Sequence, residues 1–305
     1  MKLKNVVEFQ PAPNPDVLLK DILYRYIREI DPLKPIGDTH RTLLHALAEK
    51  HEIGKKSVML TAKDIIDHAI ERRKTVEPQT VLQDMTYLRG PLKYAKAVWK
   101  IGPGIAPLEE AWPVLEKYNL VWKGRPRTRR PSSEEIAQLQ ALAVERSKDP
   151  HTKAPMHTII EFAIYSCRRR GEITRLRWED FEEEKRMLTV RDMKDPKHKV
   201  GNHHRFPLLG RAFDIVKAQP MTDERIFPYN ANSIGQAFIA MKHVLGIEGL
   251  RFHDLRREGI TRLLEAGYTP QQVKLVSGHK TIVILDRVYS AMNPESLHNG
   301  PQHPR

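Results

Sequence analysis

The segment SCRRRGEITRLRWEDF, residues 166–181, carries charged residues that the helical pattern around it does not require. Arg169 lies three residues before Glu172, a spacing that places both side chains on one face of a helix or of its first turn, where they can pair. An arginine fixed by a carboxylate is a rigid fork suited to binding two oxygens of a phosphate. A surface ion pair is the simpler interpretation of these two residues alone, so other segments decide between the two.

Two further segments combine basic and histidine side chains. In RFHDLRREGITRLL, residues 251–264, His253 and Arg256 lie three positions apart on one helical face. In DMKDPKHK, residues 192–199, Lys194 follows a β-favouring run and is expected on a hairpin. Taken individually, a capping histidine and a solvated lysine are the commoner roles of such residues.

The segment SGHKTIVILDRVYSAM, residues 277–292, contains a Gly-His pair and, ten residues after that histidine, a tyrosine. Gly278 permits a close backbone approach beside His279. An aromatic residue in an apolar segment usually packs in a core, so Tyr289 by itself does not indicate a nucleophile. The order of these residues along the chain is more informative than any one of them.

The composition limits the class of protein. Lysine and arginine number 51 and acidic residues 38 among 305 residues, a formal net charge of +13. This charge attracts polyanions, so nucleic acid or an anionic membrane face is the first partner to consider, although enzymes of anionic metabolites can be equally basic. We expect a cytoplasmic location, because we find no signal peptide and no apolar segment that could cross a membrane. The single cysteine, Cys167, excludes an intrachain disulfide.

Periodicity predicts two helical regions separated by a basic linker. The helical patterns cover 16–30, 40–50, 61–74 and 78–99 ahead of the linker, and 134–146, 209–219, 231–245, 253–266 and 270–277 after it. Residues 185–208 contain two β-favouring runs around a Gly-Asn turn, which predicts a hairpin. The expected fold class is therefore mainly α with a small antiparallel β-sheet. We predict a short segment at 1–15, an all-α domain at 16–122, a linker at 123–130, a second domain at 131–293 and a tail at 294–305.

The predicted linker, KGRPRTRR at 123–130, is rich in basic residues. A solvated spacer needs only small polar residues, whereas closely spaced positive charges suit a phosphate backbone. We therefore expect DNA contacts from five side chains: Lys123, Arg125, Arg127, Arg129 and Arg130. Ser132 and Glu135 predict a capping box where the next helix begins.

The ordered set of motifs resembles the tyrosine recombinase, or phage integrase, family. SCRRRGEITRLRWEDF is similar to the family pattern TGLRxxELxxLRWxDI, HDLRREGITRLLEAG to HDLRHTxAxxLxxxG, and VSGHK to LLGHS. The resemblance is strong over 124–293 and weaker over 16–122, where PQTVLQDMTYLRGPLKYA is similar to the family's core-binding helices. Each motif is weak alone, but the ordered set is highly specific.

The resemblance implies a site-specific DNA recombinase with a core-binding domain and a catalytic domain that close around duplex DNA. It implies four protomers on two duplexes, in the cytoplasm of a bacterium. It implies that Tyr289 is the nucleophile, that a 3′-phosphotyrosyl intermediate forms without metal or ATP, and that Glu172 orients the first arginine. The other implied catalytic residues are Arg169, Lys194, His253, Arg256 and His279.

This chain departs from the family pattern at two points. Most members place the tyrosine nine residues after the histidine, and here the interval is ten, so we expect a local bulge in TIVILDRV at 281–288. Ser277 stands where leucine or methionine is common, and we expect this change to matter little.

Three alternatives compete with this interpretation. A type IB topoisomerase would use the same chemistry on one duplex, and a non-catalytic DNA-binding relative would keep the basic surface without the nucleophile. His198, His203 and His204 form a possible zinc site, but their spacing does not match a usual ligand set. We therefore expect no metal and no other cofactor.

Overall fold

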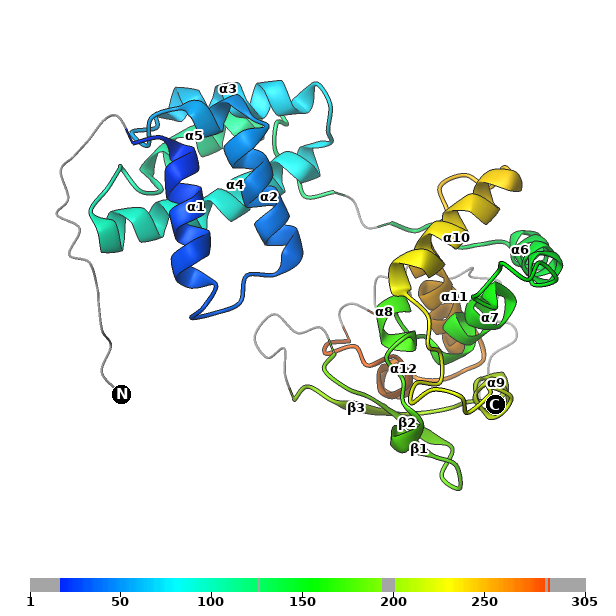
Figure 1. Ribbon diagram of the computed structural model, residues 1–305. Coiled ribbons are helices and arrows are strands. Elements are labelled where there is room, and N and C mark those ends of the chain that lie inside the picture. Colours follow the sequence, from blue (N-terminus) through cyan, green and yellow to red (C-terminus); the bar gives the residue numbers. More distant parts are fainter. Residues whose placement is uncertain (1–16, 125–126, 194–200, 283–284, 286–305) are drawn as a thin grey trace, which may run out of the picture. The chain divides into compact units, whose positions relative to one another are not determined.

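The computed structural model describes residues 17–124, 127–193, 201–282 and 285 of the chain. Backbone packing divides the chain into two compact units, 1–125 and 126–305 (Figure 1). Each unit has its own hydrophobic core. The predicted linker spans the boundary between them. Among the described residues, no helix is both long enough and apolar enough to cross a membrane.

The described part of the first unit is helical. Its α-helices are α1 (Leu19–Ile30), α2 (Asp38–Glu49), α3 (Ala62–Arg73), α4 (Pro78–Tyr94) and α5 (Ala106–Lys117), with a 3-10 turn at Glu52–Lys55 and a π-helical turn at Ala95–Trp99. The helix starts predicted at Thr61 and Pro78 are confirmed: the Thr61 hydroxyl accepts a hydrogen bond from the Asp64 backbone N–H, and Pro78 occupies the first turn of α4. Helix α5 was not predicted, because Pro107 and Pro113 interrupt its helical pattern.

The second unit begins with helices and returns to them after a small sheet. Its α-helices are α6 (Ser133–Arg146), α7 (Met156–Ser166), α8 (Arg170–Ile173), α9 (Arg211–Lys217), α10 (Ala231–Val244), α11 (Phe252–Glu265) and α12 (Pro270–Ser277), with a 3-10 turn at Trp178–Asp180. The predicted capping box is present, since the Ser132 hydroxyl and the Glu135 carboxylate each accept a hydrogen bond from the other residue's backbone N–H.

The sheet confirms the predicted hairpin and adds a third strand. Strands β2 (Met187–Val190) and β3 (His204–Pro207) pair antiparallel, with Leu188 opposite Phe206. Strand β1 (Phe181–Glu182) pairs with the other edge of β2. It was missed because two residues are too short to show an alternating pattern. The fold class is mainly α with a small antiparallel sheet, as predicted.

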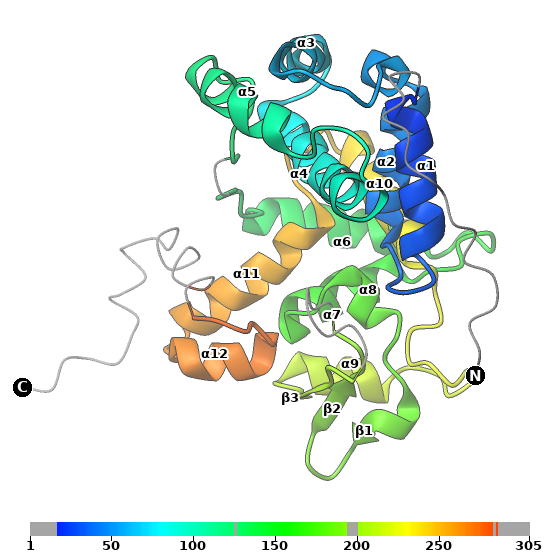
Figure 2. The same cartoon turned by 90° about the vertical axis from the view of Figure 1, so that its left-hand side faces the viewer.

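Close packing of α11 on α7 sets the geometry of the charged residues. A Cβ atom added to Gly259 of α11 would lie 1.9 Å from the carbonyl oxygen of Ile164 and 2.9 Å from the Cys167 sulfur. Only a glycine therefore permits the two helices to come this close. Figure 2 shows α11 with α12 beside it, and α12 also packs against β3.

Replacing Gly259 with alanine is expected to destabilise the second unit. The added methyl group must push the α7 backbone away from α11, which costs about 1–3 kcal/mol. Urea unfolding measures this as a lower midpoint at an unchanged slope. Gly171→Ala is the control, because a Cβ there meets no atom within 4 Å. An equal midpoint shift in both variants would show that helix contact is not the cause.

Candidate active site

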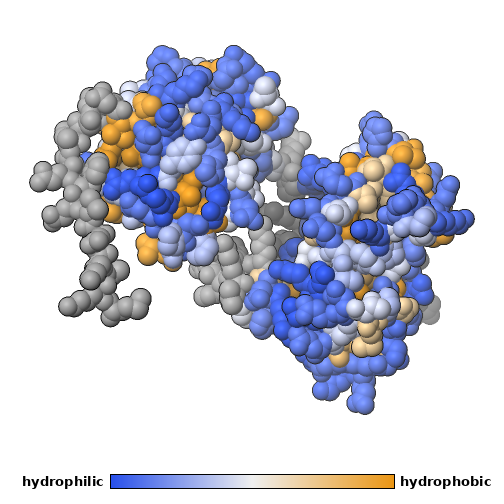
Figure 3. Space-filling view, viewed as in Figure 1, coloured by the Kyte–Doolittle hydropathy of each residue, from blue (hydrophilic) through white to orange (hydrophobic). Residues whose placement is uncertain are grey.

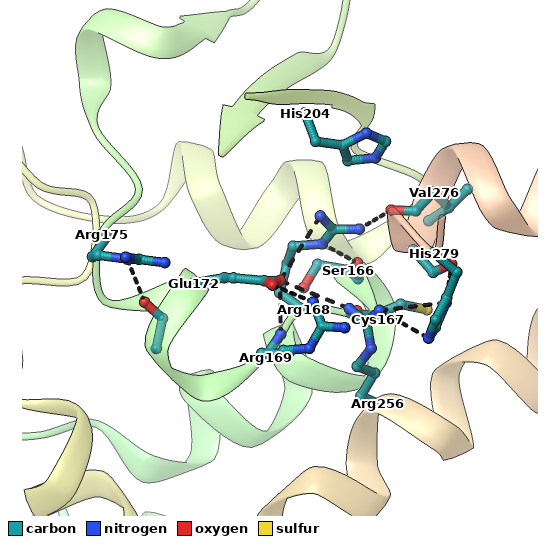
Figure 4. A network of polar contacts seen from close by, with 12 residues as sticks. Ser166, Cys167, Arg168, Arg169, Glu172, Arg175, His204, Arg256, Val276 and His279 are labelled. Carbon is teal, nitrogen blue, oxygen red and sulfur yellow. Dashed lines mark hydrogen bonds and ion pairs between the residues drawn. The ribbon is translucent and has the colours of Figure 1, made fainter. Parts of the chain in front are cut away.

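The Glu172 carboxylate lies at the centre of a cluster of arginines (Figure 4). Its side chain is 3% exposed. The Arg169 Nη1 atom is 2.6 Å from Oε1, and the nearest nitrogens of Arg256 and Arg168 lie 3.7 and 4.0 Å from Oε2. Burial alone would raise the pKa of Glu172, but the three guanidinium groups hold it below its usual value. The carboxylate is therefore ionised and leaves the cluster with a surplus of positive charge.

Arg169 is oriented by the short helix that follows it. It is the N-cap residue of α8, and its backbone N–H donates to Glu172 Oε2 at 3.1 Å. The same carboxylate accepts the guanidinium hydrogen bond at 2.6 Å, so one acid fixes both ends of the arginine. The pair predicted from the three-residue spacing is present. The Arg169 side chain stays 34% exposed, which leaves part of it open to a ligand.

Arg256 reaches the same cluster from α11 and is 2% exposed. Its Nη1 atom donates to the carbonyl oxygen of Cys167 at 2.5 Å. Cys167 caps α7 in the left-handed conformation, with φ of 54°. This turn ends α7 and directs a carbonyl group toward α11. Burial, followed by the charges of Arg169 and Arg168, lowers the pKa of Arg256.

His279 lies beside Arg256 after the turn that ends α12. Gly278 adopts the left-handed conformation that terminates the helix, with φ of 70°. Ser277 Oγ lies 2.8 Å from the ring Nδ1 atom, and Arg256 Nη2 lies 3.2 Å from Nε2. These partners fit a neutral ring that donates from Nδ1 and accepts at Nε2. Burial and the charges of Arg256, Arg169 and Arg168 lower the pKa of His279 to about 3.

His253 is exposed at the start of α11 and borders a hollow of about 670 Å³. Surrounding protein atoms and the charge of Arg256 lower the pKa of its ring. The cationic side chains that line the hollow beside His253 are Arg169, Arg170, Lys242 and Arg251. Its apolar lining includes residues of α10, and Figure 3 shows hydrophobic residues gathered over this helix, where Ile239 and Val244 are exposed.

Two predicted catalytic residues, Lys194 and Tyr289, lie outside the described residues, as does the expected bulge at 281–288 except for 281, 282 and 285. The described neighbours of Lys194 nevertheless approach the site. Met193 donates its backbone N–H to the Asn202 carbonyl at 2.8 Å, and its terminal methyl would contact a Cβ atom at Gly278. Met193, which precedes Lys194, thus lies beside Gly278, which precedes His279.

The three described arginines of the predicted linker have acidic partners within the second unit. Arg127 donates to Asp254 at 3.1 Å, and Arg129 pairs with Glu135. Arg130 donates to Glu258 and Glu265 of α11, each at 2.5 Å. Lys123 is exposed, and Arg125 lies outside the described residues.

Sequence reasoning missed three side chains that contact the cluster or its neighbours. Arg168 is fully buried next to Glu172, Ser277 touches the His279 ring, and His204 contacts α12. Arg168 was not distinguishable within a run of three arginines. Ser277 was expected to matter little. The only feature that distinguished it in the sequence was a small polar residue at a position where leucine or methionine is common. Among the described residues there is no group of three possible metal ligands, and His198 lies outside them.

Comparison with known proteins identifies the family. The model of the phage integrase family matches residues 132–296, which is more than half of the chain. The chain belongs to the phage integrase family. An integrase/recombinase from Haemophilus influenzae is 28% identical to this integrase-family chain over 91% of this chain and 88% of its own length.

Solved structures share the fold of this integrase-family chain at low sequence identity. The Tn1549 transposon integrase in complex with transposon right end DNA has a TM-score of 0.66 and 15% identity, covering 93% of this chain and 98% of its own. A lambda integrase tetramer bound to a Holliday junction has a TM-score of 0.60 and 15% identity, covering 92% and 79%. The family inferred from the ordered motifs is confirmed.

The low pKa of His279 predicts a pH-dependent loss of stability. A histidine titrates near 6.5 in an unfolded chain, so between about pH 6.5 and pH 3 the unfolded state binds the extra proton. Stability should therefore fall as pH falls through this window. In His279→Gln, which does not titrate, about 2 kcal/mol of the loss between pH 7 and pH 5 should disappear. Urea unfolding at both pH values measures this, and identical losses in the two proteins would contradict the low pKa.

The paired linker arginines predict a stability role for Arg130. Arg130→Met leaves two carboxylates of α11 without a partner from the linker and should destabilise the protein by about 1–3 kcal/mol. The control Lys123→Met changes an exposed residue and should leave stability within about 0.5 kcal/mol. Thermal and urea unfolding measure both. No loss of stability in Arg130→Met would show that these ion pairs do not hold the linker on α11.

Proposed function

We propose that this protein is a site-specific DNA recombinase that cuts and rejoins strands through a 3′-phosphotyrosyl intermediate on Tyr289. The observation that carries the proposal is the arrangement of Arg169 and Arg256 around one buried carboxylate, with His279 against the second arginine. Two guanidinium groups held in this way form a preorganised site for one phosphate group.

The charge of the cluster fits a phosphodiester. Three arginines surround one ionised carboxylate, and a cation buried in this way is stabilised by an anionic ligand. In the transition state of strand cleavage, negative charge gathers on the non-bridging oxygens of the phosphate. Arg169 and Arg256 would bind these oxygens directly. These two side chains would thus neutralise the charge that a metal ion neutralises in other enzymes.

The proposed cleavage step involves two proton transfers, one from the attacking tyrosine and one to the leaving 5′-oxygen. The Tyr289 oxygen attacks phosphorus as the phenolic proton passes to His253. The bond from phosphorus to the 5′-oxygen breaks, and Lys194 protonates that oxygen, because an alkoxide is a poor leaving group at neutral pH. His279 would donate from Nε2 to a phosphate oxygen, in the other neutral tautomer, whose Nδ1 accepts from the Ser277 hydroxyl. Attack by a 5′-hydroxyl of another strand reverses the step and releases the tyrosine.

The cationic hollow beside His253 would bind the DNA that flanks the reacting phosphate. Its arginine and lysine side chains suit phosphate oxygens, and its apolar residues suit the sugar and base faces. The first unit would serve as the core-binding domain, and Lys123 and Arg125 of the linker, rather than the paired arginines, would contact the DNA backbone. By analogy with the lambda integrase tetramer on a Holliday junction, four protomers would act on two duplexes in the bacterial cytoplasm.

The proposal is tested by trapping the covalent intermediate. A duplex nicked near the cleavage site loses the short strand that would otherwise rejoin, so the protein–DNA adduct accumulates and is seen on a denaturing gel. The DNA should carry the recombination site, found first by selecting bound fragments from a random pool. We expect an adduct with the wild-type protein in EDTA and none with Tyr289→Phe.

The same assay separates the alternatives. If the cleaved strand is rejoined only within its own duplex, the protein is a type IB topoisomerase. If strands of two different duplexes are joined, it is a recombinase. DNA binding without any adduct would contradict the proposed chemistry and indicate a non-catalytic relative. Persistence of the adduct in Tyr289→Phe would remove that tyrosine from the mechanism.

A further inference from the structure

Arg168 is a fully buried arginine whose guanidinium group binds backbone carbonyl groups. Its Nη2 atom donates to the Val276 carbonyl of α12, and its Nε atom donates to the Ser166 carbonyl at 3.2 Å. The guanidinium carbon lies 4.2 Å from the centre of the Phe206 ring. Figure 4 shows the side chain extending from the Glu172 cluster to Val276.

His204, on β3, contacts the neighbouring carbonyl group of the same helix. Its Nε2 atom lies 2.8 Å from the Leu275 oxygen, so this nitrogen carries the donated proton. The Gly278 N–H donates to the Lys274 carbonyl at 2.8 Å. The carbonyl groups of Lys274, Leu275 and Val276 therefore all have donors, two of them from outside the helix. We call Arg168 and His204 the α12 anchor.

The α12 anchor lies next to the residue that would bind the phosphate. Val276 is three residues before His279, and the only residues between them are Ser277 and Gly278. Ser277 hydrogen-bonds the His279 ring, and a Cβ atom at Gly278 would lie 2.9 Å from both the His204 ring and the Met193 methyl. The position of His279 thus depends on where the anchor holds the end of α12.

Stability alone does not explain the anchor. Burying a guanidinium group costs several kcal/mol, and an apolar side chain of similar volume is often as stable or more so. Burial lowers the pKa of Arg168 to about 10. The presence of a buried arginine here is better explained by the contacts that it makes. Its guanidinium group joins three elements by directional contacts: the end of α7, β3 and α12.

We propose that Arg168 and His204 are positioning residues that set His279, and with it the β2–β3 hairpin, for the phosphoryl transfer step. The inference rests on the proposed function, because it assigns His279 to the reacting phosphate. Neither residue of the anchor is proposed to contact DNA. Loss of the anchor should therefore slow cleavage without weakening DNA binding.

The test is single-turnover cleavage of the nicked duplex at saturating protein. Arg168→Met should slow adduct formation by about 10- to 100-fold, since a misplacement of about 1 Å has effects of this size. DNA affinity, measured separately, should be unchanged. His204→Leu should also be slow, whereas His204→Gln, which keeps an N–H donor, should recover most of the rate. Arg205→Met is the matched control, because Arg205 lies on the same strand in an exposed pair with Glu182.

A double-mutant cycle distinguishes positioning from general loosening of the fold. In a His279→Ala background, Arg168→Met should have little further effect, because the residue that it positions is already absent. An equal rate loss in both backgrounds would overturn the inference, as would loss of DNA affinity in Arg168→Met. If Arg168→Met does not fold, as judged by thermal unfolding, the comparison of His204→Leu with His204→Gln decides. Absence of any wild-type adduct would instead refute the proposed function.

Discussion

The Glu172 carboxylate is the interaction on which the candidate site depends. It is almost fully buried, and its two oxygens lie within 4.0 Å of nitrogens from three arginines. One negative charge orients these groups without neutralising them. The site therefore gains a fixed geometry and keeps a positive potential, the two properties that a preorganised phosphate site requires.

The surrounding fold brings distant segments to this carboxylate. The left-handed turn at Cys167 ends α7 and presents a carbonyl group to Arg256, while Gly259 allows α11 to approach closely enough to reach it. The α12 anchor connects the same cluster to the turn that carries His279. Backbone conformation and helix contact thus determine where the charges meet, and burial beside these charges lowers the pKa of His279.

The sequence predicted the elements of the site better than their contacts. The three-residue spacing predicted the pair of Arg169 with Glu172, and β-favouring runs around a Gly-Asn turn predicted the hairpin, because both are local properties of the sequence. The anchor could not be predicted, because Arg168 and Val276 are 108 residues apart and meet only through tertiary packing. Linker arginines expected on DNA pair with acids of the second unit, since charge in a sequence does not reveal its partner.

The most direct measurement compares cleavage of a normal phosphodiester with cleavage of a neutral methylphosphonate at the same position, by wild type and by Arg169→Ala. If the arginines act by neutralising charge on the phosphate, Arg169→Ala should be slower on the phosphodiester by about 100-fold or more. On the methylphosphonate, which lacks that charge, the two proteins should cleave at similar rates. An equal deficit of Arg169→Ala on both substrates would contradict a phosphate-neutralising role for the arginine cluster.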